Sequence, residues 1–148
     1  MKALLQRVSR ASVEVDGQQI AAIQTGLLVF LGVAAGDTEE QVVWLADKTL
    51  GLRIFPGAGA DVLKPMNRSV LDVGGEILVV SQFTLAADTG KGRRPGFSTA
   101  APPELAQALY EAFVTELGRK APVQTGRFGA DMQVSLVNNG PVTFMLER

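Results

Sequence analysis

Cysteine and histidine are both missing from this sequence of 148 residues. Without cysteine, the chain forms no disulfide and offers no thiolate to a metal ion or a substrate. Without histidine, it has no Ser-His-Asp triad, no histidine-bound zinc and no histidine general base. Catalysis by this chain would therefore have to use carboxylates, hydroxyls, lysine or arginine, backbone groups, or the substrate itself.

Strong charge and long apolar runs are also missing. The formal net charge is -1 and the pI is about 5.4, which argues against tight, non-specific binding along a nucleic acid but leaves room for a local basic patch. The first residues, Met1–Arg7, lack the apolar core of a signal peptide, and no run approaches the roughly 18 apolar residues of a membrane span. We therefore expect the cytoplasm as the compartment, and no membrane partner.

The composition is that of a globular protein, with 47% hydrophobic and 20% charged residues. A chain of this length suits a single domain over residues 1–148 and can bury a core without disulfides or metals. We predict an α+β fold with more strand than helix.

Strands are predicted in the first half of the chain. Val13 and Val15 alternate with acidic residues, and Asp16-Gly17 follows as a hairpin turn. The apolar run Leu27–Val33 suits a strand that is buried on both faces. Ile77–Val80 is a shorter buried strand that runs directly into polar residues.

Two helices are predicted between and after these strands. The first begins after Asp37 or Thr38 as the cap and stops near Gly51. The second begins at Pro102-Pro103, because proline is tolerated in the first turn, and ends at Gly118.

Two further strands are predicted near the C-terminus, from Met132 to Leu136 and from Val142 to Leu146, with Asn139-Gly140-Pro141 between them. Asn-Gly is a common hairpin turn and proline can open an edge strand, so a plain turn is one interpretation. The functional interpretation is a cis Gly-Pro bond. Glycine without a Cβ would then let a ligand approach the backbone closely.

The predicted strand Ile77–Val80 ends in the polar segment Ser81-Gln82-Phe83-Thr84. Two hydroxyls, an amide and successive backbone N–H groups at a rigid strand end suit a substrate carbonyl and its developing oxyanion. Ordinary hydrogen bonds of serine and threonine at a strand terminus would also explain the pattern.

Positive charge is densest at Lys91, Arg93 and Arg94, within a polar segment over 87–101 that we expect to be a surface loop. This cluster suits contact with phosphates, although a solvated loop would look the same. Gly57-Ala58-Gly59 lacks the following Lys-Ser/Thr of a phosphate loop.

Five segments, taken together and in this order, resemble the D-aminoacyl-tRNA deacylase family nearly from end to end. They are Leu5-Gln6-Arg7-Val8, Leu52-Arg53-Ile54-Phe55, Ser81-Gln82-Phe83-Thr84-Leu85, Gly126-Arg127-Phe128-Gly129-Ala130-Asp131-Met132 and Asn139-Gly140-Pro141-Val142-Thr143-Phe144. The chain departs from the family at Asn139, where Asp is usual, and at Arg93 and Gly96 of the basic loop, where Asn and Ser are frequent.

The resemblance implies a homodimeric hydrolase with a strand-rich, barrel-like sheet, two main helices and active sites at the dimer interface. It implies cleavage of the ester that joins a D-amino acid, or achiral glycine, to the terminal adenosine of tRNA, as proofreading in translation quality control. We expect no metal and no other cofactor. Carried onto this chain, the resemblance implies a catalytic segment of Ser81, Gln82, Phe83 and Thr84, and a cis bond at Gly140-Pro141 that one subunit inserts into the other's pocket. It implies that Arg7, Met132 and Asn139 line or support the pocket. The candidates for RNA contact are Lys91, Arg93 and Arg94.

Exclusion of the L enantiomer suits a rigid backbone wedge. A discrimination of about 10⁴ needs roughly 5.5 kcal/mol. A hydrophobic pocket that senses one methylene supplies only about 1–3 kcal/mol, whereas steric blocking has no such ceiling. Two mechanisms of hydrolysis are open. In the first, backbone N–H groups around Phe83 and Thr84 stabilise the oxyanion, and the substrate's ribose 2′-hydroxyl helps to activate water. In the competing hypothesis Thr84 is a covalent nucleophile, but it lacks an evident base.

Two other functions remain open at this point. A non-catalytic RNA-binding module would use the Lys91–Arg94 loop, although the acidic pI and the absence of an aromatic stacking motif speak against it. A general hydrolase of small esters would have no role in RNA metabolism.

Overall fold

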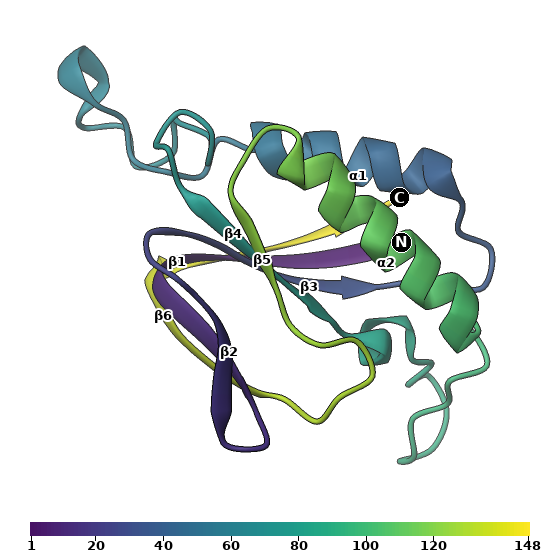
Figure 1. Cartoon of the computed structure of the whole chain (residues 1–148). Helices are drawn as coiled ribbons and strands as arrows, with labels where there is room; N and C mark the ends of the chain where they lie inside the picture. Colours follow the sequence, from purple (N-terminus) through teal and green to yellow (C-terminus); the bar gives the residue numbers. More distant parts are fainter.

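Six strands form one mixed, strongly bent sheet, and two helices cover one of its faces (Figure 1). The computed structural model describes all residues from Met1 to Arg148. The strands are β1 (Lys2–Val15), β2 (Gln18–Ile23), β3 (Gly26–Gly32), β4 (Glu76–Ser81), β5 (Val123–Thr125) and β6 (Gln133–Glu147); the helices are α1 (Glu39–Gly51) and α2 (Pro103–Gly118), with short 3₁₀ helices η1 (Gly59–Asp61) and η2 (Phe83–Ala86).

The strand order is β2-β1-β3-β4-β5, and β6 pairs with the other side of β1. β1 is antiparallel to its three partners, and it reaches β3 with residues 2–8 and β2 with residues 11–15. β3, β4 and β5 are parallel neighbours, with α1 and α2 as the crossovers between them. Because β1 bends to serve partners at both ends, the sheet curls into the barrel-like form that we expected.

Two apolar cores lie on opposite faces of the central strands. Leu27, Val29 and Leu31 of β3 point towards the helices and join the larger core. Leu28 of β3 points the other way, into a smaller core inside the curled sheet together with Leu78 and Val80 of β4. The prediction that Leu27–Val33 is buried on both faces is therefore confirmed in nearly all of its residues.

Local sequence signals set the predicted turn and helix boundary. Asp16 and Gly17, with φ of 53° and 76°, make the tight turn between β1 and β2. Thr38 caps α1, and its backbone N–H donates to the Gln41 side chain at 2.8 Å in a capping box. Neither α1 nor α2 combines the length and apolar character that a membrane span requires.

Of the two interpretations of Asn139-Gly140-Pro141, the plain turn between two paired strands is wrong and the cis Gly-Pro bond is confirmed. Residues 133–138 and 143–147 belong to one long strand, β6, and both halves pair with β1 rather than with each other. The register with β1 shifts where the strand bends at Asn139-Gly140-Pro141, and the Gly140-Pro141 peptide bond is cis. Neither β5 nor the 3₁₀ helix η2, which begins at Phe83, was predicted from the sequence.

Candidate active site

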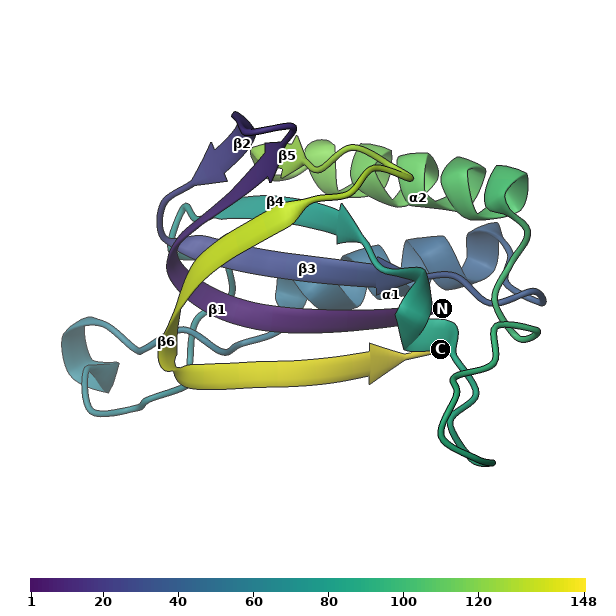
Figure 2. The same cartoon turned by 90° about the horizontal axis from the view of Figure 1, so that it is seen from below.

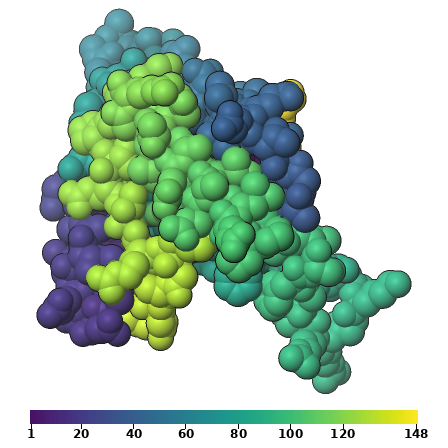
Figure 3. Space-filling model, turned by 45° about the vertical axis from the view of Figure 1, so that its right-hand side comes forward, coloured from purple at the N-terminus to yellow at the C-terminus, as the bar shows by residue number.

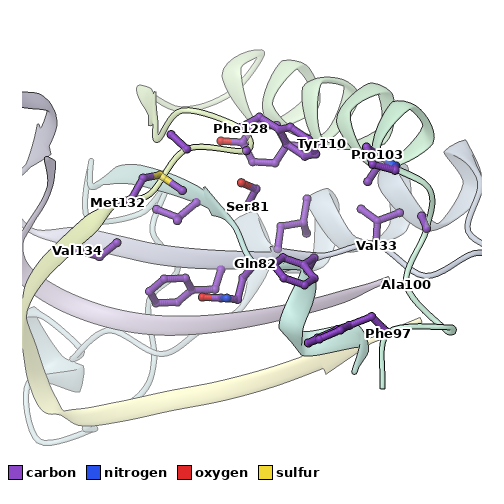
Figure 4. A pocket seen from close by; sticks show the side chains of 18 residues that line it. Val33, Ser81, Gln82, Phe97, Ala100, Pro103, Tyr110, Phe128, Met132 and Val134 are labelled. Atoms are coloured by element: carbon purple, nitrogen blue, oxygen red, sulfur yellow. The ribbon is translucent and has the colours of Figure 1, made fainter. Parts of the chain in front are cut away.

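An apolar pocket of about 570 Å³ lies between the end of β4, the first half of α2 and the segment that leads into β6 (Figure 4). Its volume is within the range of small-molecule sites, roughly 300–1,000 Å³. Because 14 of its 18 lining residues are hydrophobic, few polar groups are left to orient a ligand. The principal polar side chains are those of Ser81 and Gln82, and in Figure 4 the Ser81 side chain lies between those of Met132 and Tyr110.

The end of β4 is held against the end of β3. The Gln82 N–H donates to the Leu31 carbonyl at 2.8 Å. Gly32 allows the close approach that follows, because a Cβ there would lie 2.8 Å from the Leu85 Cβ and 3.0 Å from the Gln82 carbonyl oxygen. The polar segment therefore sits on a fixed strand end, as the sequence suggested.

The first turn of η2 presents free backbone donors next to the pocket. Neither the Phe83 N–H nor the Thr84 N–H donates a hydrogen bond within the chain. The Thr84 hydroxyl accepts a hydrogen bond from the Gln82 amide at 2.6 Å, and its side chain is exposed rather than part of the pocket wall. No carboxylate or amine contacts this hydroxyl, so the chain itself offers it no general base.

Tyr110 forms part of the pocket wall and was missed by the sequence analysis. Its side chain is 5% exposed, its hydroxyl donates to the Val79 carbonyl at 2.9 Å, and its ring packs 5.8 Å from that of Phe128. Burial raises the pKa of Tyr110 to about 12, against a smaller opposing effect of a hydrogen bond with Thr125. The sequence predicted the helix that carries Tyr110, but the acceptor for its buried hydroxyl comes from β4 and is supplied only by the folded chain.

We predict that Tyr110 makes stability depend on alkaline pH. Between pH 10 and about 12 the folded protein keeps a phenol proton that the unfolded chain has lost, so the free energy of unfolding falls by up to about 1.4 kcal/mol per pH unit in this window and is unaffected below it. In Tyr110→Phe this contribution should vanish. At neutral pH the variant should lose only about 1 kcal/mol, because the Val79 carbonyl still accepts from the Gly126 N–H at 2.9 Å.

Urea unfolding of both proteins across this pH range measures the difference. Tyr110 is the only tyrosine, so its titration is directly visible in the ultraviolet spectrum. If the free energy of unfolding falls equally steeply with pH in wild type and in Tyr110→Phe, folding does not raise the pKa of the phenol.

A second cluster holds the bend of β6. Arg7 is 7% exposed; its Nε donates to the Asn139 carbonyl at 2.8 Å and its Nη1 to the Ile54 carbonyl at 2.5 Å. Asn138, which the sequence analysis did not single out, spans the bend by accepting from the Val142 N–H at 2.7 Å and donating to the Thr143 hydroxyl at 2.8 Å. An asparagine two residues before a Gly-Pro pair was the available signal, since asparagine side chains bond readily to nearby backbone.

The pocket residues and the cluster at the bend of β6 lie apart within one chain. Ser81, Gln82, Phe83 and Met132 line the pocket, whereas the bend residues and Arg7 do not. Figure 2 shows the bend of β6 at the side of the sheet where β3 begins and the η2 helix at the side where β3 ends. The residues that the resemblance assigns to one site therefore meet only if a second copy supplies one of the clusters.

The basic loop is a projecting hairpin. Asp88 and Gly96 exchange two backbone hydrogen bonds of 2.8 Å at its base. Lys91, Arg93 and Arg94 at its tip are exposed and take part in no salt bridge. Figure 3 shows this segment extending away from the body of the molecule. No group of three or more acidic side chains is arranged to hold a metal ion.

The fold is shared with solved structures. One described as "c-Myc DNA Unwinding Element Binding Protein" superposes with a TM-score of 0.93 at 43% identity, covering 100% of this chain and 99% of that chain. Another, described as "Structural Analysis of a probable eukaryotic D-amino acid tRNA deacylase", has a TM-score of 0.82 over 98% of this chain and 97% of that chain; at 19% identity it supports the fold alone.

Similarity in sequence extends over the whole chain. Residues 4–147 match the family model described as "D-Tyr-tRNA(Tyr) deacylase". Proteins named D-aminoacyl-tRNA deacylase are 58% identical in Geotalea uraniireducens and 60% identical in Roseiflexus castenholzii, in each case over 99% of this chain and over 93% and 92% of the relative. The chain belongs to the D-Tyr-tRNA(Tyr) deacylase family.

Proposed function

We propose that this chain hydrolyses the ester bond of D-aminoacyl-tRNA, releasing the free D-amino acid and the tRNA. The observation that carries the proposal is the match to the deacylase family over residues 4–147. The pocket supports it, because it is large enough for an amino acid on an adenosine and carries Ser81 and Gln82 at a rigid strand end. Glycine, which has no side chain to exclude, would be released from mischarged tRNA by the same site.

In the proposed mechanism the main chain stabilises the charge that develops on the substrate. The free N–H groups of Phe83 and Thr84 lie in the first turn of η2, and they would donate to the oxyanion formed when water attacks the ester carbonyl. An aminoacyl ester is already activated, so its hydrolysis demands less than cleavage of a peptide. The ribose 2′-hydroxyl of the substrate would help to position the water, which agrees with a chain that contains no histidine.

Thr84→Ala separates this mechanism from covalent catalysis. We expect turnover of D-tyrosyl-tRNA within about tenfold of wild type, because the backbone N–H groups remain and only the hydrogen bond from Gln82 is removed. Removal of a true nucleophile costs several orders of magnitude. Single-turnover rates measure the effect, with Thr84→Ser as the matched control; a variant that is inactive as alanine but active as serine would restore the nucleophile hypothesis.

Selection against L substrates is proposed to come from Gly140-Pro141 of a second copy. Both residues are exposed, and Arg7 and Asn138 hold the bend around them. A wedge made of backbone cannot rotate away as a side chain can, so it would block an L side chain sterically rather than by a weaker fit. The active form would then be a homodimer with its pockets at the interface, with Met132 as a pocket residue and Asn139 presenting the carbonyl that Arg7 holds.

The RNA partner is proposed to be the acceptor end of aminoacyl-tRNA, in the cytoplasm, where charged tRNA is used. Lys91, Arg93 and Arg94 are free to contact its phosphates, because they are exposed and form no salt bridge. The small net charge of -1 agrees with a few local contacts rather than extended binding.

Incubation with D-tyrosyl-tRNA and with L-tyrosyl-tRNA tests the proposed function. The enzyme should clear only the D substrate, with a preference of about 10⁴. A protein that merely binds RNA would clear neither. Rapid cleavage of a D-tyrosine methyl ester, with no preference for the tRNA-linked form, would point instead to a general hydrolase of small esters.

A further inference from the structure

Two aromatic rings lie exposed at the rim of the pocket. Phe83 is 58% and Phe97 44% exposed, while the other aromatic side chains of the chain are buried or half-buried. Their ring centroids are 5.0 Å apart and the rings are inclined by 53°. Both residues contribute to the pocket wall, yet neither belongs to the apolar cores, so packing alone does not explain why they are aromatic.

The Phe97 ring is attached to well-held backbone. The paired residues Asp88 and Gly96 close the hairpin directly before it, and the Ala100 N–H donates to the Phe97 carbonyl at 3.1 Å. The hydroxyl of Thr99 donates to the Ala86 carbonyl of η2, the helix that begins with Phe83. In Figure 4, Phe97 lies at the edge of the cavity beyond Ala100, on the far side from Met132 and Val134.

Free positive charge lies on the hairpin that leads into Phe97. Arg94 is three residues from Phe97, a stretch of chain that spans at most about 11 Å. Lys91 and Arg93 follow at the tip of the same hairpin, all of them exposed. Exposed aromatic faces and unpaired cations along one surface segment are the combination with which proteins bind single-stranded nucleic acid, since every base has a face that can stack.

We propose that Phe97, backed by Phe83, is a stacking platform for the base of the nucleotide that precedes the terminal adenosine, with Lys91, Arg93 and Arg94 on the phosphates that flank it. The inference rests on the proposed function, in which the terminal aminoacyl-adenosine occupies the pocket. The rings stand at the rim, so they face what continues outward from that nucleoside. The 3′ end of a tRNA is single-stranded, and its next base is therefore free to stack.

Substrates of increasing length test the platform. D-tyrosyl-adenosine ends at the pocket, D-tyrosyl-cytidylyl-adenosine adds the next nucleotide, and D-tyrosyl-tRNA adds the rest. In Phe97→Leu, which keeps an apolar side chain without a ring, kcat/KM for the dinucleotide relative to that for D-tyrosyl-adenosine should fall about tenfold, mainly through KM. D-tyrosyl-tRNA should behave like the dinucleotide, and Phe97→Tyr should restore the wild-type ratio.

The outcomes that contradict the platform are distinct from a failure of the proposed function. An equal loss on D-tyrosyl-adenosine and on the dinucleotide would place the ring on the terminal nucleoside instead. An unchanged ratio in Phe97→Leu would show that the ring contacts no base. The same result is expected if these rings instead form a contact surface for another protein. If the wild type clears none of the three substrates, the proposed function fails and the platform with it.

Salt dependence tests the cations independently. Replacing Lys91, Arg93 and Arg94 together with alanine should flatten the dependence of log kcat/KM on log salt concentration for D-tyrosyl-tRNA, by about 0.7 for each phosphate that the protein no longer neutralises. D-tyrosyl-adenosine has no phosphate, so it is the control substrate. An unchanged slope for D-tyrosyl-tRNA would remove the hairpin from the RNA interface.

Discussion

Gly140→Ala is expected to reduce the preference for D-tyrosyl-tRNA over L-tyrosyl-tRNA at least 100-fold. The φ of Gly140 is +143°, a conformation that residues with a side chain rarely adopt. A Cβ there would lie 2.6 Å from the Val142 Cγ2, 3.0 Å from the Val142 nitrogen and 3.1 Å from the Arg7 Nη2. The bend must therefore change shape, and under the proposed function a displaced wedge no longer blocks the L side chain.

The ratio of kcat/KM values for the two tRNAs measures this effect. Gly118→Ala is the matched control, because an added Cβ there meets nothing within 4 Å and Gly118 has no positive φ. Circular dichroism and the dimer fraction, measured alongside, separate a local change from loss of fold or assembly. A folded, dimeric Gly140→Ala protein with wild-type selectivity would remove the bend from chiral selection.

Arg7→Ala is expected to lower both the stability and the selectivity of the protein. The buried guanidinium donates to the carbonyls of Asn139 and Ile54 and has no carboxylate partner, and burial lowers its pKa, although arginine stays charged in proteins. Its removal leaves two carbonyls short of a donor, at about 1–3 kcal/mol each, so we expect about 2–6 kcal/mol less stability. Without this support the bend should sample other positions, and the D/L ratio should fall at least tenfold.

Urea unfolding and the two tRNA assays measure these losses together. Arg7→Lys is the informative partner variant, because a lysine keeps the charge but cannot reproduce the two-pronged geometry of the guanidinium. We expect Arg7→Lys to recover part of the stability and little of the selectivity. Stability within about 0.5 kcal/mol of wild type in Arg7→Ala, with unchanged selectivity, would contradict the assigned role.

Much of the fold was predictable because its signals are local. The capping box of Thr38 and Gln41 fixes the start of α1, and Asp16-Gly17 fixes the first turn. The uninterrupted apolar run of β3 shows that both its faces are covered, which two helices and a curled sheet provide. Each of these features depends on residues that are close together in the chain.

The features that were missed depend on distant residues. The alternating patterns on either side of Asn139-Gly140 were recognised, but the pattern does not say that both segments pair with β1. Nor could periodicity show that the hydroxyl of Tyr110 bonds to the Val79 carbonyl of β4. The resemblance assigned Gly140-Pro141 and Ser81-Gln82 to one site, while a single folded chain keeps them apart.

A crystal structure with a non-hydrolysable D-aminoacyl-adenosine analogue would test the central claim most directly. The account predicts two copies of the chain, with the aminoacyl group beside Ser81 and Gln82, its carbonyl oxygen within hydrogen-bond reach of the Phe83 and Thr84 N–H groups, and the second copy's Gly140-Pro141 against its Cα on the side where an L side chain would project. A ligand bound in the pocket with both copies' bends facing solvent would contradict it.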